Sequence, residues 1–536
     1  MSNICKAVTN FNNYNEFVVT KHGIFYGRIV CSKMPKLILK EDKVMKKFMA
    51  CALSTCMVAA TLVGCDNGNV TPADPADPAQ DPGQDPAVVE PGDAEVPEGT
   101  FGDWAITDSP VGFFWGGTWV IANKNVTKDA DKKAAVAQIM EWITLDTSET
   151  GLQYLWANGT FDVAESDLPS DQIITPANGG DKGTILLYTF TTEVPRMMLK
   201  YAQDNPDFGY KIQYKVTPTD GDQYVTDLNG ALPTDSAPDM YTAESAFVYN
   251  YTQGDMAKYA APYEDLGIDI KKVDEAKIAQ YSVEIGTNPE GKLVGLGYQA
   301  TGGALIYRRS IAKDVWGTDD PAVIKEKVGG GSGNWDQFYK ACDELKAKGY
   351  AAVSGAGDLW NVVEKSSDSS WLTADGKLHI DPKREEYLDI TKKMYDNEWM
   401  NDTQAWQDPW FADMKGQGPK QVFCFFGPAW LVNYSMQDNC GNKPEDAAAA
   451  GDCVASAVVM EKSKAEPAFL GGQNMFEYFV PANAYANGKV LSKYDGTINN
   501  KFNDQVSEYK LGNKTKEEAI QAFKDAVNDE LGVEAE

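Results

Sequence analysis

The chain has 536 residues, 43% hydrophobic and 24% charged, a composition typical of a globular protein with two or three domains and untypical of a disordered or polytopic membrane protein. Its 78 acidic residues outnumber its 49 basic ones, and the formal net charge of −29 makes nucleic acid a poor partner. Of the only two histidines, His22 falls in a segment predicted below to be removed, which leaves His379. One histidine is too few for most zinc sites and leaves little choice for a serine-hydrolase triad, so we expect neither a metal nor a cofactor.

Residues 45–64 have the layout of a secretory signal peptide. Met45–Lys47 is basic, and the apolar run 48–63 that follows is too short for a stable membrane span. The run closes with LVG before Cys65, which resembles a bacterial lipobox, so Cys65 is predicted to be acylated and to become the first mature residue. A buried apolar helix is the alternative, but such a helix would not normally be followed directly by a Pro/Asp/Ala tract. We interpret residues 1–44 as an upstream extension.

Residues 65–100 are predicted to form a tether. This stretch is rich in Pro, Asp and Ala, so it cannot bury apolar surface and extends by self-repulsion. The order of signal, cysteine and spacer predicts a lipoprotein on the outer face of the cell membrane, held there through its lipid alone.

The body that follows alternates strand-like and helix-like patterns. A strand over 184–190, a helix opening at Glu193 and ending at Asn205-Pro206, and a strand over 211–217 form a predicted βαβ unit, hence an α/β fold with a largely parallel sheet. In chain order the predicted elements are strand 118–122, helix 130–144, strand 184–190, the helix from 193, strand 211–217, helix 335–348 and helix 516–531.

Tryptophans flanked by glycine or proline are frequent in this body. Any one of them can simply fill a core, but several in one α/β body favour a cleft lined by aromatic faces. A sugar has apolar C–H faces and a rim of hydroxyls, so its binder needs flat aromatic rings together with fixed carboxylates and amides. The candidate rings are Trp115, Trp119, Trp360, Trp410 and Trp430, and the candidate polar partners are Glu193, Glu244, Gln299, Asp358, Gln473 and Asn474.

Each polar candidate has a structural alternative. Glu193 is also suited to be a first-turn helix acid, and Asp358 a turn residue. Cys440 and Cys453 flank a short polar loop and are candidates for a disulfide.

Five segments carry a resemblance to a known family: TILLYTFTTEVPRM, APDMYTAESAFV, GLGYQATGGALIYRR, QVFCFFGPAW and LGGQNMFEYFVPANAY. Together they resemble the family 1 extracellular solute-binding proteins of ABC transporters. The resemblance implies a two-lobe, periplasmic-binding-protein-like fold of type II, with mixed sheets flanked by helices and a cleft that closes about a hinge. It also implies a monomer that delivers a sugar or oligosaccharide to ABC permease subunits.

The segment order departs from that family. The stretch that resembles residues 101–161 follows the FFGPAW tract in the family, whereas here it precedes TILLYTF, and residues 441–451 stand in its place. We predict lobe one at 101–300, with 162–182 as a connector, and lobe two at 301–536. We further expect 441–451 to be an exposed loop close to Phe101 and Phe161. Strand 118–122 should share a sheet with strand 184–190, and helix 130–144 should cover that lobe.

The leading hypothesis is a lipid-anchored receptor for a sugar or oligosaccharide that carries out no bond chemistry. The alternative is a secreted glycoside hydrolase, which needs two carboxylates roughly 5–10 Å apart, and Glu193 and Glu244 are candidates for that pair. An adhesive surface protein would show repeats or flat exposed patches, and the sequence shows neither. The sequence does not identify the sugar, its length or its linkage.

Overall fold

The computed structural model describes residues 98–219, 222–445 and 447–536. The predicted signal peptide, Cys65 and almost all of the tether lie outside these residues. No helix of the described part is both long enough and apolar enough to span a bilayer.

A six-stranded sheet in the order β3-β5-β4-β6-β2-β7 forms the centre of lobe one. β4 runs parallel to β5 and β6, while β3, β2 and β7 pair antiparallel with their neighbours. The prediction of a largely parallel sheet is therefore wrong outside the β5-β4-β6 centre, because β2 leaves the hinge and β7 enters it without a crossover helix. The strands are β2 (Thr118–Ala122), β3 (Ile173–Ile174), β4 (Gly183–Thr189), β5 (Tyr210–Val216), β6 (Met240–Glu244) and β7 (Gly295–Gly297).

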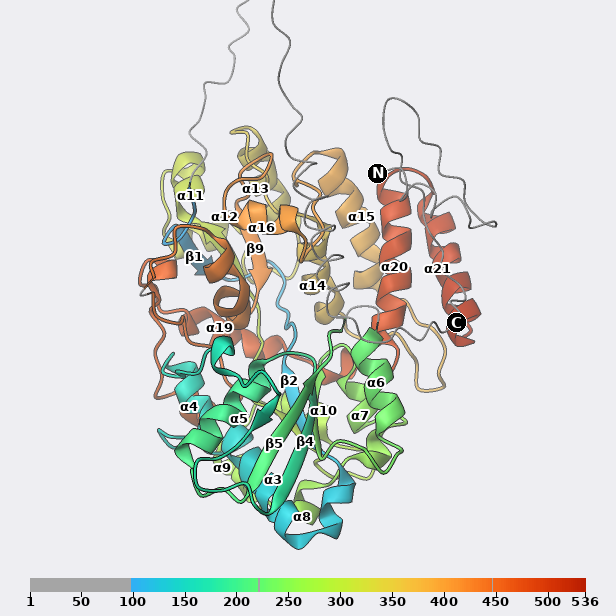
Figure 1. Cartoon of the computed structure of the whole chain (residues 1–536). Coiled ribbons are helices and arrows are strands. Elements are labelled where there is room, and N and C mark those ends of the chain that lie inside the picture. Colours follow the sequence, from blue (N-terminus) through green and yellow to red (C-terminus); the bar gives the residue numbers. More distant parts are fainter. Residues whose placement is uncertain (1–97, 220–221, 446) are drawn as a thin grey trace, which may run out of the picture. The chain divides into compact units, whose positions relative to one another are not determined.

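The predicted βαβ unit is confirmed as β4, helix α5 (Glu193–Asp204) and β5. α5 buries Val194, Met197 and Met198 on one face because these residues recur at helical spacing. The other helices of lobe one (Figure 1) are α3 (Ala130–Thr144), α4 (Leu152–Ala157), α6 (Gln223–Ala231), α7 (Val248–Thr252), α8 (Tyr263–Leu266), α9 (Lys271–Glu275) and α10 (Gln280–Gly286).

Lobe two is built on an antiparallel sheet in the order β1-β8-β9, with β1 at Trp104–Thr107, β8 at Ala304–Arg308 and β9 at Cys424–Gly427. Every residue of these three strands is buried. The helices from here to the C-terminus are α11 (Arg309–Trp316), α12 (Pro321–Val328), α13 (Asp336–Lys346), α14 (Ala356–Ser366), α15 (Pro382–Asp396), α16 (Asp408–Met414), α17 (Gln437–Asn439), α18 (Ala457–Met460), α19 (Phe476–Ala482), α20 (Asp495–Lys510) and α21 (Lys516–Leu531).

Strand β1 corrects the predicted start of lobe one. Trp104 pairs with Arg308 and Thr107 with Leu305, so this strand belongs to the sheet of lobe two although it lies within 101–300. Lobe one begins only at β2, because the intervening residues cross between the lobes.

Three chain segments cross between the lobes side by side. The Trp115 N–H donates to Thr301 O at 3.0 Å, and the Gly303 N–H donates to Phe113 O at 2.9 Å. The segment that contains residues 300–303 also pairs with the third crossing, where the Ala300 N–H donates to Cys453 O at 2.9 Å. These paired crossings form the hinge expected from the family resemblance.

Loop 441–451 lies against both ends of the displaced segment. The Phe101 N–H donates to Asn442 Oδ1 at 3.1 Å, and Gly159 packs against Ala449. The described residues of the loop are largely exposed, β2 shares the sheet of β4, and α3 packs in the core of that lobe, as expected. The rearranged order itself stays a prediction.

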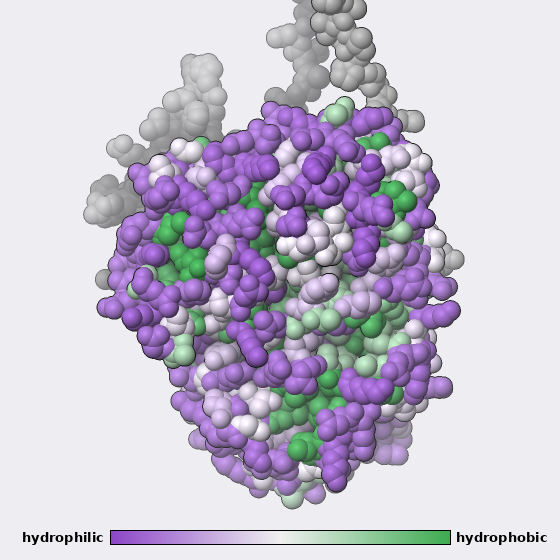
Figure 2. All heavy atoms as spheres, turned by 180° about the vertical axis from the view of Figure 1, so that it is seen from behind, coloured by the Kyte–Doolittle hydropathy of each residue, from purple (hydrophilic) through white to green (hydrophobic). Residues whose placement is uncertain are grey.

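Seen from behind, hydrophilic residues cover most of the surface, and hydrophobic residues gather in patches between them (Figure 2). This distribution agrees with a chain that carries a net charge of −29.

Candidate ligand-binding cleft

A cleft of about 1780 Å³ lies between the lobes. Lobe one contributes residues that follow the carboxyl ends of its strands, among them Phe190 and Glu193 after β4 and Glu244 at the end of β6. The hinge contributes Gln299 and Asp452. Open α/β sheets commonly bind ligands at this edge, because strand ends leave side chains that no neighbouring strand covers.

Lobe two contributes an aromatic wall. The Trp115 and Trp430 ring centroids lie 4.7 Å apart, and Trp406 stacks on Trp430 at 6.2 Å with 11° between the planes. The Trp430 indole N–H donates to Trp115 O at 2.9 Å, which fixes that ring. Tyr434 continues the wall from a π-helical turn, Leu431–Met436, and is 60% exposed.

Trp406 stands out within this wall. It is 41% exposed although it is the largest side-chain type, and its backbone φ is 67°, a left-handed conformation that bulky residues rarely adopt. Its ring leans on buried Trp410 at 5.0 Å. Backbone strain of this kind persists where the surrounding structure imposes it, and it clusters at binding sites.

Carboxylates with neutral partners occupy the hinge side of the cleft. The Tyr298 hydroxyl donates to Glu193 Oε1 at 2.6 Å. Asp452 Oδ2 accepts from Gln299 Nε2 and from Trp156 Nε1, both at 3.1 Å. Burial raises the pKa of Asp452 to about 7, with a further contribution from the nearby charge of Glu193. Burial also raises the pKa of Glu193.

Glu244 accepts from the Ser245 hydroxyl at 2.6 Å and from the Ala246 N–H at 2.8 Å. Burial raises its pKa, while these two donors and the Lys365 ammonium of lobe two act in the opposite direction. Glu244 thus faces a buried charged cluster across the lobe boundary.

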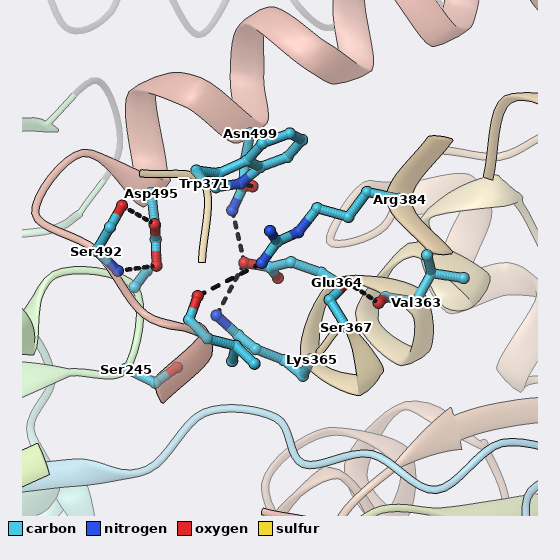
Figure 3. Close-up of polar contacts among 12 residues, drawn as sticks. Ser245, Val363, Glu364, Lys365, Ser367, Trp371, Arg384, Ser492, Asp495 and Asn499 are labelled. Atoms are coloured by element: carbon cyan, nitrogen blue, oxygen red, sulfur yellow. Dashed lines mark hydrogen bonds and ion pairs between the residues drawn. The ribbon is translucent and has the colours of Figure 1, made fainter. Parts of the chain in front are cut away.

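That cluster, which we call the hinge cluster because it faces Glu244 across the lobe boundary, lies on α14, α15 and α20 and comprises Glu364, Lys365, Arg384, Asp495 and Asn499 (Figure 3). Lys365 Nζ lies 2.8 Å from Glu364 Oε1, and Asn499 Nδ2 donates to the same oxygen at 2.7 Å. Burial alone would raise the pKa of Glu364, but Lys365, Arg384 and Asn499 together hold it below its usual value. Both members of the Glu364–Lys365 pair are almost fully buried, so their charges are neutralised inside the protein.

The family profile described as "Bacterial extracellular solute-binding protein" matches residues 197–490, which is more than half of the chain. The chain belongs to this family. It is therefore an exported protein whose family binds solutes outside the cell. No curated protein matches this solute-binding protein significantly.

Several solved structures are similar to it. A substrate-binding protein of an ABC transporter from Listeria monocytogenes, in complex with cycloalternan, is 15% identical, with a TM-score of 0.45, and the match covers 66% of this chain and 100% of that one. The GacH receptor of Streptomyces glaucescens, studied unliganded and with acarbose, is 16% identical, with a TM-score of 0.45 and coverages of 66% and 99%. The galacto-N-biose/lacto-N-biose I-binding protein of Bifidobacterium longum is 15% identical, with a TM-score of 0.44 and coverages of 66% and 98%.

Five predicted ligand residues of this solute-binding protein line the cleft together. Glu193 and Glu244 come from lobe one, Gln299 from the hinge, and Trp430 from lobe two. Trp115 lies in the first hinge crossing and packs on Trp430. Whether these residues touch ligand stays a prediction.

Three predicted tryptophans fill cores instead. Trp119 is 1% exposed and donates to Ser282 O at 3.1 Å. Trp360 packs among aromatic rings of the lobe-two core, and Trp410 is 1% exposed, with its indole N–H donating to Asp358 at 3.0 Å. Each lies in a regular element, where the position that faces the core is fixed by the helix or strand.

The remaining polar candidates bond to the protein itself. Asp358 accepts from Trp410 and, at 3.1 Å, from the Gly355 N–H at the start of α14. Gln473 pairs with both backbone groups of Ile106 at 2.8 Å, which covers the free edge of β1. Asn474 accepts from the Phe476 N–H at 3.3 Å, in the turn before α19. None of these three lines the cleft among the described residues.

The proposed disulfide is wrong, because Cys440 and Cys453 are both free and buried. Cys440 ends α17 with its N–H bonded to Met436 O at 2.9 Å, whereas the Cys453 carbonyl accepts from Ala300 in the hinge. Each backbone is thus held by partners other than the second cysteine.

The cleft residues that the sequence prediction did not include are numerous, and among them are Trp156, Trp406, Tyr434 and Asp452. Trp406 precedes Trp410 by four residues in TQAWQDPW, so the signal that selected Trp410 covered it as well. Nothing in the local sequence of Asp452 indicates that it meets Gln299, because that contact joins residues 153 positions apart.

Proposed function

We propose that this solute-binding protein captures a sugar or oligosaccharide in the interlobe cleft and delivers it to an ABC importer. The observation that carries the proposal is the composition of the cleft, where the Trp115, Trp406 and Trp430 rings share one cavity with Glu193 and Asp452. Flat rings match the C–H faces of a sugar, and buried carboxylates accept hydrogen bonds from its hydroxyls.

Closure of the lobes is the proposed mechanism. A ligand that touches Trp430 of lobe two and Glu193 of lobe one gains both sets of contacts only when the lobes approach each other. It therefore shifts an open–closed equilibrium toward the closed state. The three paired crossings at the hinge supply the segments about which the lobes rotate.

Anchoring through Cys65 is part of the proposal. A monomer tethered to the outer face of the membrane by one lipidated cysteine and a spacer stays close to its permease. Replacing Cys65→Ala should release the protein into the medium or leave it unprocessed. Mature protein that retains intact residues 1–64 would contradict the anchor.

A thermal-shift screen over mono- and oligosaccharides tests the binding function. We expect at least one sugar to raise the melting temperature, because ligand that binds only the folded state stabilises it. The sugar should be recovered unchanged, since the proposal includes no bond cleavage. Hydrolysis of the sugar, or shifts produced only by ligands that are not sugars, would contradict it.

A further inference from the structure

The charges that line the cleft are strongly unbalanced. Among the described residues, seven carboxylate side chains line it, against three basic ones, Arg196, Lys443 and Lys493. The basic groups are engaged by the protein: Arg196 Nε donates to Val163 O at 2.8 Å, Lys443 pairs with Asp438 at 2.6 Å, and Lys493 lies over the Tyr494 ring at 4.6 Å. Acidic side chains thus outnumber basic ones in the cleft, and one of the three basic groups, Lys443, is already paired with a carboxylate.

The three most buried of these carboxylates, Glu193, Glu244 and Asp452, form no ion pair within the described residues, and their hydrogen bonds come from neutral donors. A carboxylate accepts about four hydrogen bonds, so each retains acceptor capacity toward the cavity. A sugar hydroxyl supplies the missing donor without adding charge.

From this geometry we propose that the cleft binds uncharged glycans and excludes glycans that carry carboxylate or sulfate groups. The proposal rests on the function proposed above and narrows its substrate class. An anionic group placed beside Glu193 meets like charge, and one placed beside Asp452 does so wherever that carboxyl, with its pKa of about 7, is ionised. Repulsion between like charges weakens the binding of such a group. Burial is the main cause of the raised pKa of Asp452, and the nearby Glu193 charge raises it further, so negative charges in this part of the cleft repel each other.

A capture experiment with the full chain tests the selectivity. The protein is incubated with a mixed digest of plant polysaccharides that contains neutral and uronate-bearing oligosaccharides, separated from free glycan by gel filtration and denatured, and the released glycan is resolved by anion exchange. We expect the acidic fraction to be depleted at least tenfold relative to the input. Acidic glycan retained in proportion or enriched overturns the inference while leaving the receptor function intact. Retention of no glycan contradicts both.

Two variants and a salt series locate the cause. Glu193→Gln, alone and combined with Asp452→Asn, should reduce the discrimination several-fold, whereas Glu275→Gln, an exposed carboxylate outside the cleft, should not change it. The ability of neutral glycan to raise the melting temperature shows that each variant is folded. Because buried charges are poorly screened, the discrimination should persist at about 0.5 M salt, roughly three times the physiological ionic strength. If the discrimination vanishes at high salt and is unchanged in both variants, it comes from the net charge of the whole protein, and the proposal is overturned.

Discussion

The hinge cluster and the cleft both bury carboxyl groups, but the partners of those groups differ: cationic side chains in the hinge cluster and neutral donors in the cleft. In the hinge cluster, Glu364 meets a lysine at 2.8 Å and an amide at 2.7 Å, and its pKa is lowered despite burial. In the cleft, Glu193 and Asp452 meet only neutral donors, and their pKa values are raised. A buried charge that the protein neutralises serves the structure, whereas one left facing a cavity is available to a ligand.

The largest effect should come from breaking the hinge cluster. Lys365→Met leaves the Glu364 carboxylate buried without its cation, and we expect the free energy of unfolding to fall by about 3–5 kcal/mol. Urea unfolding monitored by fluorescence measures this. The double variant Glu364→Gln, Lys365→Met should be less damaged than the Lys365→Met single variant, because no uncompensated charge remains. Equal damage would show that the pair acts through packing alone.

On the cleft side, removing a ring that lines the cleft should affect binding more than folding. Trp406→Ala and Trp430→Ala should each weaken sugar binding by about 1–3 kcal/mol, because each ring loses stacking area on the ligand. Titration calorimetry with a sugar found in the screen measures this. Trp360→Phe, a core control, should lower stability and leave affinity unchanged. A Trp430→Ala variant that unfolds easily but binds normally would place this ring with the core.

Asp452 predicts a pH dependence of stability. Its pKa is raised from 3.8 to about 7, so between these values the folded state holds a proton that the unfolded state has lost. Stability should therefore fall as pH rises through this window. The contribution from one group is about 1.4 kcal/mol per pH unit. Asp452→Asn should remove that much slope between pH 5 and 6.5, whatever its effect on absolute stability, in unfolding measured at several pH values. An unchanged slope would mean that Asp452 is ionised throughout.

The smallest effect is expected where neither region is involved. Lys277 and Glu461 form a 3.0 Å ion pair, but their side chains are 58% and 63% exposed. Lys277→Met should change the free energy of unfolding by less than about 1 kcal/mol, because water already solvates both charges. A loss as large as that of Lys365→Met would show that burial is not what separates the two kinds of pair.

Local sequence alone determined the elements whose signals lie within a few residues. Helix α21 spans Lys516–Leu531 as predicted, since Thr515 and Glu518 form its capping box and Gly532 takes a left-handed φ of 65° at its end. β2 and α3 also match their predicted bounds. Hydrophobic periodicity and capping depend on near neighbours, so one sequence is enough to find them.

Only the tertiary structure decided which side chains face the cleft. Trp406 and Trp410 lie four residues apart, yet Trp406 is 41% exposed and Trp410 1%, because α16 turns Trp410 toward Asp358. The hinge cluster likewise joins Glu364 to Asn499 across 135 positions. Residue type and spacing along the chain indicated a sugar-type cleft, but whether a given ring or carboxylate meets ligand or core depends on contacts between distant segments, which no local pattern records.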